Sequence, residues 1–278
     1  MDLRELGLRQ NQLDVVSRFL DLCQADPRIL AAYLSGSYAS GQADAYSDVD
    51  LFFVTTPEAY SAFLAEKQAF ARKLGGLLFL EDFGVPHGYL FIHENGTEGE
   101  FWFSRPDNVQ DVMSGPHVVL FDRGGIQTVD VAPALAVDPA RQRDLLRRQL
   151  DWFWHELAHY IKAMGRREWW FAYGQVEAMR RICVILTRLD HDYSDAAIEE
   201  NEPYFKIEAA LPVERLKPMR ITFCGVEPAE LLQAGNALVQ YYQALAPRLA
   251  ESHELTYSLA LERLLVPQMQ KLSRAGYG

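Results

Sequence analysis

The sequence has little cysteine, no long hydrophobic run and a deficit of positive charge. Its cysteines, Cys23, Cys183 and Cys224, are odd in number and widely spaced, so they form neither a disulfide framework nor a set of zinc ligands. No run approaches the roughly 18 apolar residues of a transmembrane helix, and the charged N-terminal stretch MDLRELGLRQ lacks the apolar core of a signal peptide. We therefore expect a cytoplasmic protein with no membrane partner.

The charge balance limits the partners of the chain. Asp and Glu number 38 against 27 Lys and Arg, which gives a net charge of -11. An acidic chain repels the phosphate backbone of nucleic acids, so we expect no binding to DNA or RNA. A small cationic ligand, or a nucleotide carried with metal ions, remains compatible with this charge.

The length of 278 residues suits two domains, because single hydrophobic cores stop growing near this size. The first part alternates short apolar runs with turns, and the runs predict strands at 29–34, 49–55, 77–80, 88–93, 98–103 and 118–121. After the proline-containing segment 129–141 the apolar spacing is helical, at 142–164, 168–189, 228–246 and 253–273. We therefore predict an α+β protein, with an α/β domain at residues 1–130 and an all-α helical bundle at 131–278.

Two aspartates on one predicted strand are the most informative feature. Asp48 and Asp50 are two residues apart, so their carboxylates project from the same face of the strand. Adjacent like charges destabilise a sheet unless a cation lies between them, and Mg²⁺ prefers carboxylates together with phosphate oxygens. Upstream, Gly36 and Ser37 follow the first predicted strand and begin a short helical turn, where free backbone N–H groups can bind an anion. The pattern predicts a phosphate cradle next to a metal-binding pair.

A third carboxylate is expected on a neighbouring strand. Glu98, Glu100 and Trp102 share one face of the predicted strand 98–103. Glu100 is the better candidate because it lies deeper in the strand, and Glu98 is the fallback. We interpret Asp44 as a turn or capping residue rather than a metal ligand.

The stretch GSYASGQADAYSDVDL at 36–51 resembles the signature of the nucleotidyltransferase superfamily, in which a Gly-Ser pair precedes Asp-x-Asp by about ten residues. Within the superfamily the chain most resembles the antibiotic nucleotidyltransferases. The spacing at 44–48 and the later GEFWFSRPDN at 99–108 are similar to the lincosamide nucleotidyltransferases in particular. The resemblance implies a polymerase-β-like α/β domain with a mixed sheet, followed by a helical substrate-binding domain.

The resemblance also implies a mechanism and the residues that carry it. Asp48, Asp50 and Glu100 would hold Mg²⁺, with two ions expected, and Glu100 would be the general base. Gly36 and Ser37 would contact a nucleotide phosphate. The basic face of the helix at 142–164 supplies a further candidate, since Lys162 would bind the triphosphate.

The implied reaction moves a nucleoside monophosphate, AMP from ATP or the equivalent part of another nucleoside triphosphate, to a hydroxyl of a small-molecule antibiotic and releases pyrophosphate. A lincosamide is the leading acceptor and an aminoglycoside comes next. Members of the family are often dimers, so a homodimer is a further expectation.

Three alternatives remain open. His155, Glu156 and His159 match the HExxH helix motif of zinc proteases, in which two histidines one turn apart bind zinc and the glutamate acts as a base. A third ligand is then required. Glu177 has a suitable spacing, but the two arginines that soon follow it disfavour a cation site. The second alternative is a nucleotidyltransferase acting on a protein or a tRNA end, and the third is a non-catalytic nucleotide-binding protein.

An aromatic cluster opens the helix predicted at 168–189, and its members are Trp169, Trp170, Phe171 and Tyr173. We interpret the cluster as core packing, and a platform for a sugar ring or an alkyl chain is the alternative.

Overall fold

The computed structural model describes residues 3–109, 115–126, 138–194 and 202–274. The chain separates into two compact units, Met1–Leu135 and Ala136–Gly278, and each is described by itself. The first unit contains a mixed sheet and the second is helical, so the predicted α+β class is confirmed. The predicted domain boundary at residue 130 falls within 127–137, outside the described residues.

The first unit is built on a six-stranded sheet with the order β3-β4-β5-β2-β1-β6. The strands are β1 (Ile29–Leu34), β2 (Val49–Thr55), β3 (Leu77–Glu81), β4 (Gly88–His93), β5 (Glu98–Ser104) and β6 (Val118–Asp122). All six strands predicted from the sequence are present, with ends that differ by at most one residue. The pairing of β2 with β5 is parallel and the other pairings are antiparallel, which makes the sheet mixed.

Two helices cover one face of this sheet, α1 (Gln10–Ala25) and α3 (Pro57–Arg72). Helix α3 begins where Thr56 accepts a hydrogen bond from the backbone N–H of Ala59, and Pro57 supplies the preset backbone angle of a first turn. The core under the two helices is rich in aromatic rings, which include Phe19, Phe53, Phe63, Phe70, Phe101 and Phe103. The short elements of this unit are α2 (Gly36–Ala39) and 3-10 turns at Leu3–Leu6 and Pro106–Asn108.

The opposite face of the sheet carries a smaller apolar cluster that includes Tyr33, Phe52 and Val54. Because side chains alternate along a strand, Asp50, two residues before Phe52 on β2, lies on this face. Glu100 is the strand partner of Asp50 on β5 and lies on the same face. The predicted site residues Asp50 and Glu100 therefore lie on the face that α1 and α3 leave uncovered.

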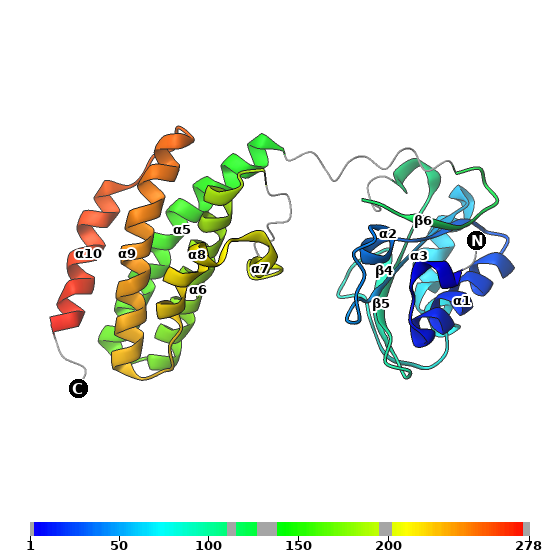
Figure 1. The fold of residues 1–278 in the computed structure, drawn as a ribbon, viewed down its shortest axis with the longest axis horizontal. Coiled ribbons are helices and arrows are strands. Elements are labelled where there is room, and N and C mark those ends of the chain that lie inside the picture. Colours follow the sequence, from blue (N-terminus) through cyan, green and yellow to red (C-terminus); the bar gives the residue numbers. More distant parts are fainter. Residues whose placement is uncertain (1–2, 110–114, 127–137, 195–201, 275–278) are drawn as a thin grey trace. The chain divides into compact units, whose positions relative to one another are not determined.

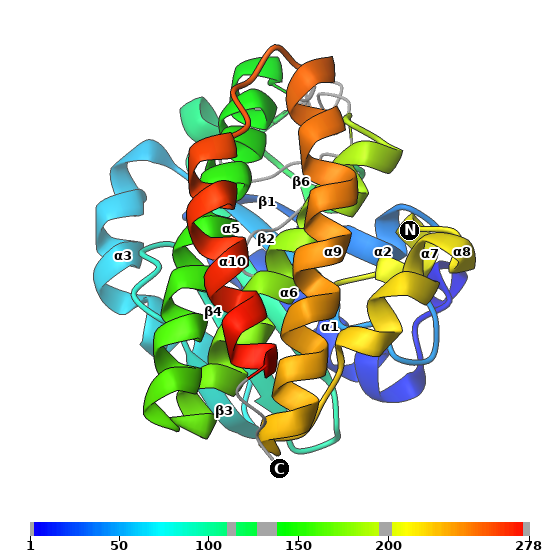
Figure 2. The ribbon, with the colours of Figure 1, turned by 90° about the vertical axis from the view of Figure 1, so that its left-hand side faces the viewer.

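The second unit is a helical bundle, and Figures 1 and 2 show its long helices side by side. Its helices are α5 (Pro139–Arg166), α6 (Trp169–His191), α7 (Ile207–Ala210), α8 (Val213–Leu216), α9 (Pro228–Ser252) and α10 (Leu259–Arg274), with a 3-10 helix at Lys217–Thr222. Phe153 of α5 stacks on Tyr242 of α9, with ring centroids 3.7 Å apart. The hydroxyl of Tyr242 donates to the carbonyl of Leu150 at 2.6 Å, which satisfies the one polar atom of that buried ring.

The close packing of α5 and α9 depends on a glycine. A Cβ on Gly235 of α9 would lie 2.7 Å from the ring of Tyr160. The Tyr160 hydroxyl then reaches the carbonyl of Leu231 at 2.9 Å. In the described part of the chain, none of the helices has the length and apolar character needed to cross a bilayer.

Candidate active site

Parallel pairing of β2 with β5 brings the predicted carboxylates together. Asp50 on β2 lies directly opposite Glu100 on β5, and the charge of Glu100 acts on Asp50. Asp48 is exposed, one residue before β2 begins, and its charge acts on both of the other carboxylates.

The pKa values of Asp50 and Glu100 are both raised, which shows that the site disfavours their ionised forms. Burial is the largest cause that raises the pKa of Asp50, and the charges of Asp48 and Glu100 add to it, so that the pKa reaches about 7. Burial also raises the pKa of Glu100 above its usual range. A polar interaction with the side chain of Trp102 opposes that shift in the pKa of Glu100. A bound cation would reduce the repulsion between these neighbouring carboxylates.

The donor set fits a hard divalent cation. Asp48, Asp50 and Glu100 offer only carboxylate oxygens, which are the ligands that Mg²⁺ prefers alongside phosphate oxygens and water. In the described ranges no group of three His, Cys, Asp or Glu side chains already stands in a metal-binding arrangement.

Gly36 lies against Asp50. A Cβ at Gly36 would fall 1.7 Å from Oδ2 of Asp50, and its φ of +64° lies in the left-handed region, so no other residue fits without displacing the carboxylate. Ser35, the residue before Gly36, connects the turn to β2, because its backbone N–H donates a hydrogen bond to the carbonyl of Asp50 at 2.8 Å. The turn and the carboxylates therefore form one unit.

Ser37 carries an unsatisfied hydroxyl. Its Oγ is buried, and it has no hydrogen-bond partner in the described structure. A buried donor without a partner is costly, so this hydroxyl is a candidate for a bond to a ligand atom. Ser37 is the residue for which the resemblance implies a phosphate contact.

The other acidic candidates near the site have different surroundings. Asp44 accepts hydrogen bonds from the backbone N–H of Tyr46 at 2.7 Å and from Ser47, which confirms the turn interpretation. Glu98 lies opposite Ile92 at the start of β5 and is exposed. The groups whose charges act on Asp50 do not include Glu98, so the structure favours Glu100 over the fallback.

Comparison with known proteins identifies the family. Residues 9–270 match the family model described as streptomycin adenylyltransferase. The chain belongs to this family. One similar solved structure is titled as an aminoglycoside 6-adenyltransferase from Bacillus subtilis, with 16% identity and a TM-score of 0.43, covering 96% of this chain and 99% of that chain. No curated protein matches the chain.

Family membership confirms the predicted enzyme class. The protein is a nucleotidyltransferase of the antibiotic adenylyltransferase type, and its co-substrate is a nucleoside triphosphate. The resemblance that the sequence carries in its Gly-Ser and Asp-x-Asp residues therefore points to the correct group. The lincosamide assignment is finer than this family match, and it stays a prediction.

The zinc-protease alternative lacks a third ligand in the described part of this adenylyltransferase. The rings of His155 and His159 lie side by side, with centroids 4.4 Å apart and planes tilted by 33°. Nδ1 of His155 lies 3.0 Å from Oε1 of the mostly buried Glu156. Glu177, the suggested third ligand, is instead ion-paired with Arg180 and accepts a hydrogen bond from Tyr204 at 2.9 Å. The two histidines are therefore neighbouring, partly exposed side chains of α5.

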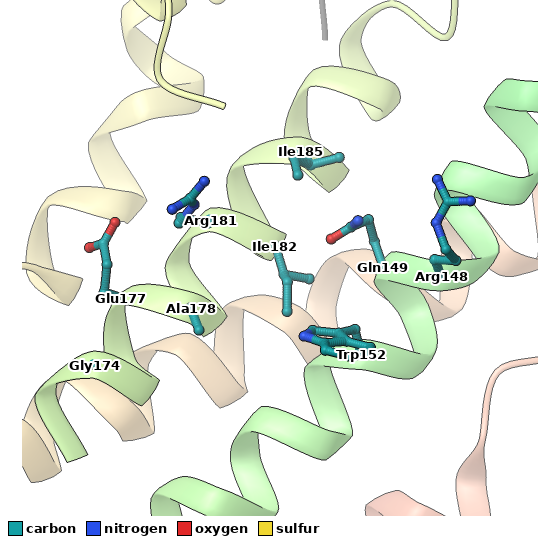
Figure 3. Close-up of a pocket in the computed structure, with 9 residues that line it drawn as sticks. All are labelled: Arg148, Gln149, Trp152, Gly174, Glu177, Ala178, Arg181, Ile182 and Ile185. Carbon is teal, nitrogen blue, oxygen red and sulfur yellow. The ribbon is translucent and has the colours of Figure 1, made fainter. Parts of the chain in front are cut away.

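The second unit of the adenylyltransferase contains a cavity of about 460 Å³ between α5 and α6 (Figure 3). It is lined by Arg148, Gln149, Trp152, Gly174, Glu177, Ala178, Arg181, Ile182 and Ile185. Figure 3 shows Gln149 and Trp152 of α5 beside Ile182 of α6. The hollow exists because Gly174 and Ala178 have small side chains, and a Cβ on Gly174 would meet open space. Sequence reasoning missed the cavity, because only the packing of the two helices reveals which positions face it.

The aromatic cluster at the start of α6 corrects one prediction. Trp170 is 79% exposed, Phe171 48% and Tyr173 37%, so the core-packing interpretation is wrong for these three rings. Trp169 alone packs against the bundle core. The buried positions of this helix are instead Ala172, Val176 and Met179 together with the residues that follow them. Lys162, on α5, is exposed, and its role in binding the triphosphate stays a prediction.

Proposed function

We propose that the protein transfers AMP from ATP to a hydroxyl of an aminoglycoside antibiotic, with Mg²⁺ as the metal and pyrophosphate as the leaving group. The carrying observation is the pairing of Asp50 with Glu100 beside Asp48 and Gly36. The family description, which names streptomycin, supports an aminoglycoside acceptor. The net charge of -11 favours a cationic acceptor as well. A lincosamide is the second acceptor class that we predict.

The proposed roles of the site residues follow from their positions. Asp48, Asp50 and Glu100 would hold Mg²⁺, which when bound neutralises charge on the triphosphate and polarises the phosphorus under attack. Ser37 would donate its unpaired hydroxyl to a phosphate oxygen. Gly36, which has no side chain, leaves the backbone open to the nucleotide on the Asp50 side of the turn.

Glu100 has the role of general base in this proposal. The acceptor oxygen forms a bond to the α-phosphorus of ATP, the bond from that phosphorus to pyrophosphate breaks, and the acceptor proton passes to the Glu100 carboxylate. Mg²⁺ held by these residues would lower the pKa of both acids, because positive charge favours their ionised forms. Glu100 is then ionised and able to accept a proton when the substrates are bound.

We propose that the helical unit contributes to binding of the acceptor, as a substrate-binding domain. Trp152 offers a half-exposed ring at the α5–α6 cavity, and such rings stack on the apolar faces of sugars. Glu177 offers a carboxylate whose position is held by Arg180 and Tyr204. Lys162, also in this unit, is the residue that we propose for the triphosphate.

Direct assay of transfer tests the proposal. The protein is incubated with Mg²⁺, each of the four nucleoside triphosphates and either streptomycin or a lincosamide, and mass spectrometry detects a nucleotidyl adduct. We expect an adenylyl adduct of streptomycin, lost in Asp48→Asn and Glu100→Gln but retained in Glu98→Gln. An adduct on the lincosamide and not on streptomycin would show that the acceptor is a lincosamide rather than an aminoglycoside. Full activity of Asp48→Asn would refute the mechanism.

A further inference from the structure

The loop between β1 and β2 carries two parts of the candidate site on two separate turns. The first turn (36–42) begins with the Gly-Ser pair, and the second turn (44–47) ends at the residue before Asp48. Each turn is closed by backbone hydrogen bonds of its own. Residues 41–46 are all exposed, so packing contributes little to their position. The bonds within each turn do not fix its distance from the other turn.

One buried side chain, Gln12 in the first turn of α1, is bonded to both turns of the loop. Only 1% of Gln12 is exposed. Its Nε2 donates a hydrogen bond to the backbone carbonyl of Ser47 at 2.7 Å. Its Oε1 accepts a hydrogen bond from the hydroxyl of Tyr38, a buried residue of α2. Gln12 therefore connects the first turn to the second through a single amide group.

The start of α1 determines which atom of the Gln12 amide faces each partner. The backbone N–H of Arg9, the residue before the helix, donates to Oε1 at 3.0 Å. Turning the amide over would place its NH₂ group against this N–H, and its oxygen against the carbonyl of Ser47. Both contacts would be repulsive, because each would join two donors or two acceptors. The amide therefore has one favourable orientation, in which it bonds to both turns.

We propose that Gln12 is a positioning residue for binding of the nucleotide with its metal. By holding Tyr38, it keeps the neighbouring hydroxyl of Ser37 in place for a phosphate oxygen. By holding Ser47, it fixes the backbone that leads directly into Asp48. The inference rests on the proposed function of the loop residues, and it adds α1 to the elements that shape the site.

The affinity for ATP in Gln12→Met is the first test. Methionine has a similar length, fills the buried space and makes neither hydrogen bond. Each typical hydrogen bond corresponds to a change of about 2- to 10-fold in an equilibrium constant. We therefore expect the Kd of ATP with Mg²⁺, measured by calorimetry, and the KM for ATP to rise about 10-fold, while the KM for the acceptor stays within twofold.

The matched control is Gln10→Met, at an exposed glutamine of the same helix whose side chain bonds to Asp14. It should bind ATP as the wild type does. A variant that is merely less stable contains less active protein, which lowers kcat and leaves both KM values unchanged. A Kd and KM for ATP within twofold of the wild type in Gln12→Met, or an equal rise in the KM for ATP and for the acceptor, would overturn the proposal.

Tyr38→Phe is a milder variant that tests the coupling. It keeps the buried ring and removes only the hydroxyl that Gln12 holds. In the otherwise unchanged chain, we expect the Kd of ATP to rise by about 2- to 10-fold. In a Gln12→Met background, the same substitution should have little further effect, because the bond is already absent. Equal rises in both backgrounds would show that Tyr38 acts independently of Gln12 and would refute the coupling.

Hydrogen exchange of the metal-free protein is independent of activity. In Gln12→Met, we expect the backbone amides of residues 36–47 to exchange about 10-fold faster, while those of β5 and α3 keep the wild-type rate. Unchanged exchange in this loop would refute the positioning role, even in a protein that transfers nucleotide. If the wild type transfers no nucleotide to any acceptor, but loop exchange and ATP affinity both respond to Gln12→Met, the proposed function fails and the role of Gln12 stands.

Discussion

Replacing Asp50 by asparagine should stabilise the metal-free first unit while abolishing transfer. The pKa of Asp50 rises from an ordinary value of 3.8 to about 7 in the folded protein, so folding favours its protonated form. The penalty for ionising Asp50 is absent below pH 3.8, grows as the pH rises, and is complete above about pH 7. Asparagine resembles the protonated acid and carries no such penalty.

The expected size follows from the shift. About three pKa units correspond to about 4 kcal/mol, at roughly 1.4 kcal/mol per unit. Since Asp50 is only partly buried, screening by water reduces this figure, and we take about 2 kcal/mol at pH 8. For a unit of this length, that difference raises the melting temperature by roughly 5 to 8 °C.

Calorimetry in a chelator at pH 4 and pH 8 measures the effect. Asp50→Asn should melt later than the wild type at pH 8 and together with it at pH 4, and Mg²⁺ should raise the melting temperature of the wild type only. Asp21→Asn, an exposed position on α1, is the matched control and should show no pH-dependent difference. Equal stability of Asp50→Asn and the wild type at pH 8, or a gain of the same size at pH 4, would refute the reasoning.

Three further substitutions test other parts of the molecule. Gly36→Ala places a Cβ 1.7 Å from Oδ2 of Asp50, so adenylyl transfer should fall by more than about 100-fold while circular dichroism stays unchanged. Arg180→Met leaves the partly buried Glu177 without its ion-pair partner and should lower the free energy of unfolding in urea by about 3 kcal/mol. Trp152→Ala removes the ring at the α5–α6 cavity, so the KM for the acceptor should rise about 10-fold while the KM for ATP does not change.

The sequence predicts the strands of the first unit well, but it predicts less completely which residues on different strands pair with each other. Alternating apolar runs bounded by glycine, proline and asparagine turns identify all six strands, and two aspartates at a spacing of two place both carboxylates on one face. Direct pairing of Asp50 with Glu100 is not encoded in either strand alone, since it depends on the parallel register of β2 and β5. The contact of Trp102 with Gly88 depends in the same way on the register of β4 with β5.

The helical unit was harder to predict at its surface. Trp170, Phe171 and Tyr173 are apolar, and hydrophobicity alone favours burying them. The periodicity of α6 shows why they are not buried, since the positions that face the core at this end are held by Ala172 and Val176. In a helix with large rings on several sides of its first turn, only the partner helices decide which side is covered.

The parallel pairing of β2 and β5 has a consequence for the order of folding. Their paired residues Asp50 and Glu100 are separated along the chain by α3, β3 and β4, so they come together through a long-range contact, of the kind that slows folding. In early folding intermediates, the carboxylates of Asp50 and Glu100 would then be far apart, and their repulsion would not destabilise these intermediates. We expect magnesium and nucleotide to slow unfolding of the native protein without speeding the early steps of folding. The reason is that the binding site does not exist until β2 and β5 have paired.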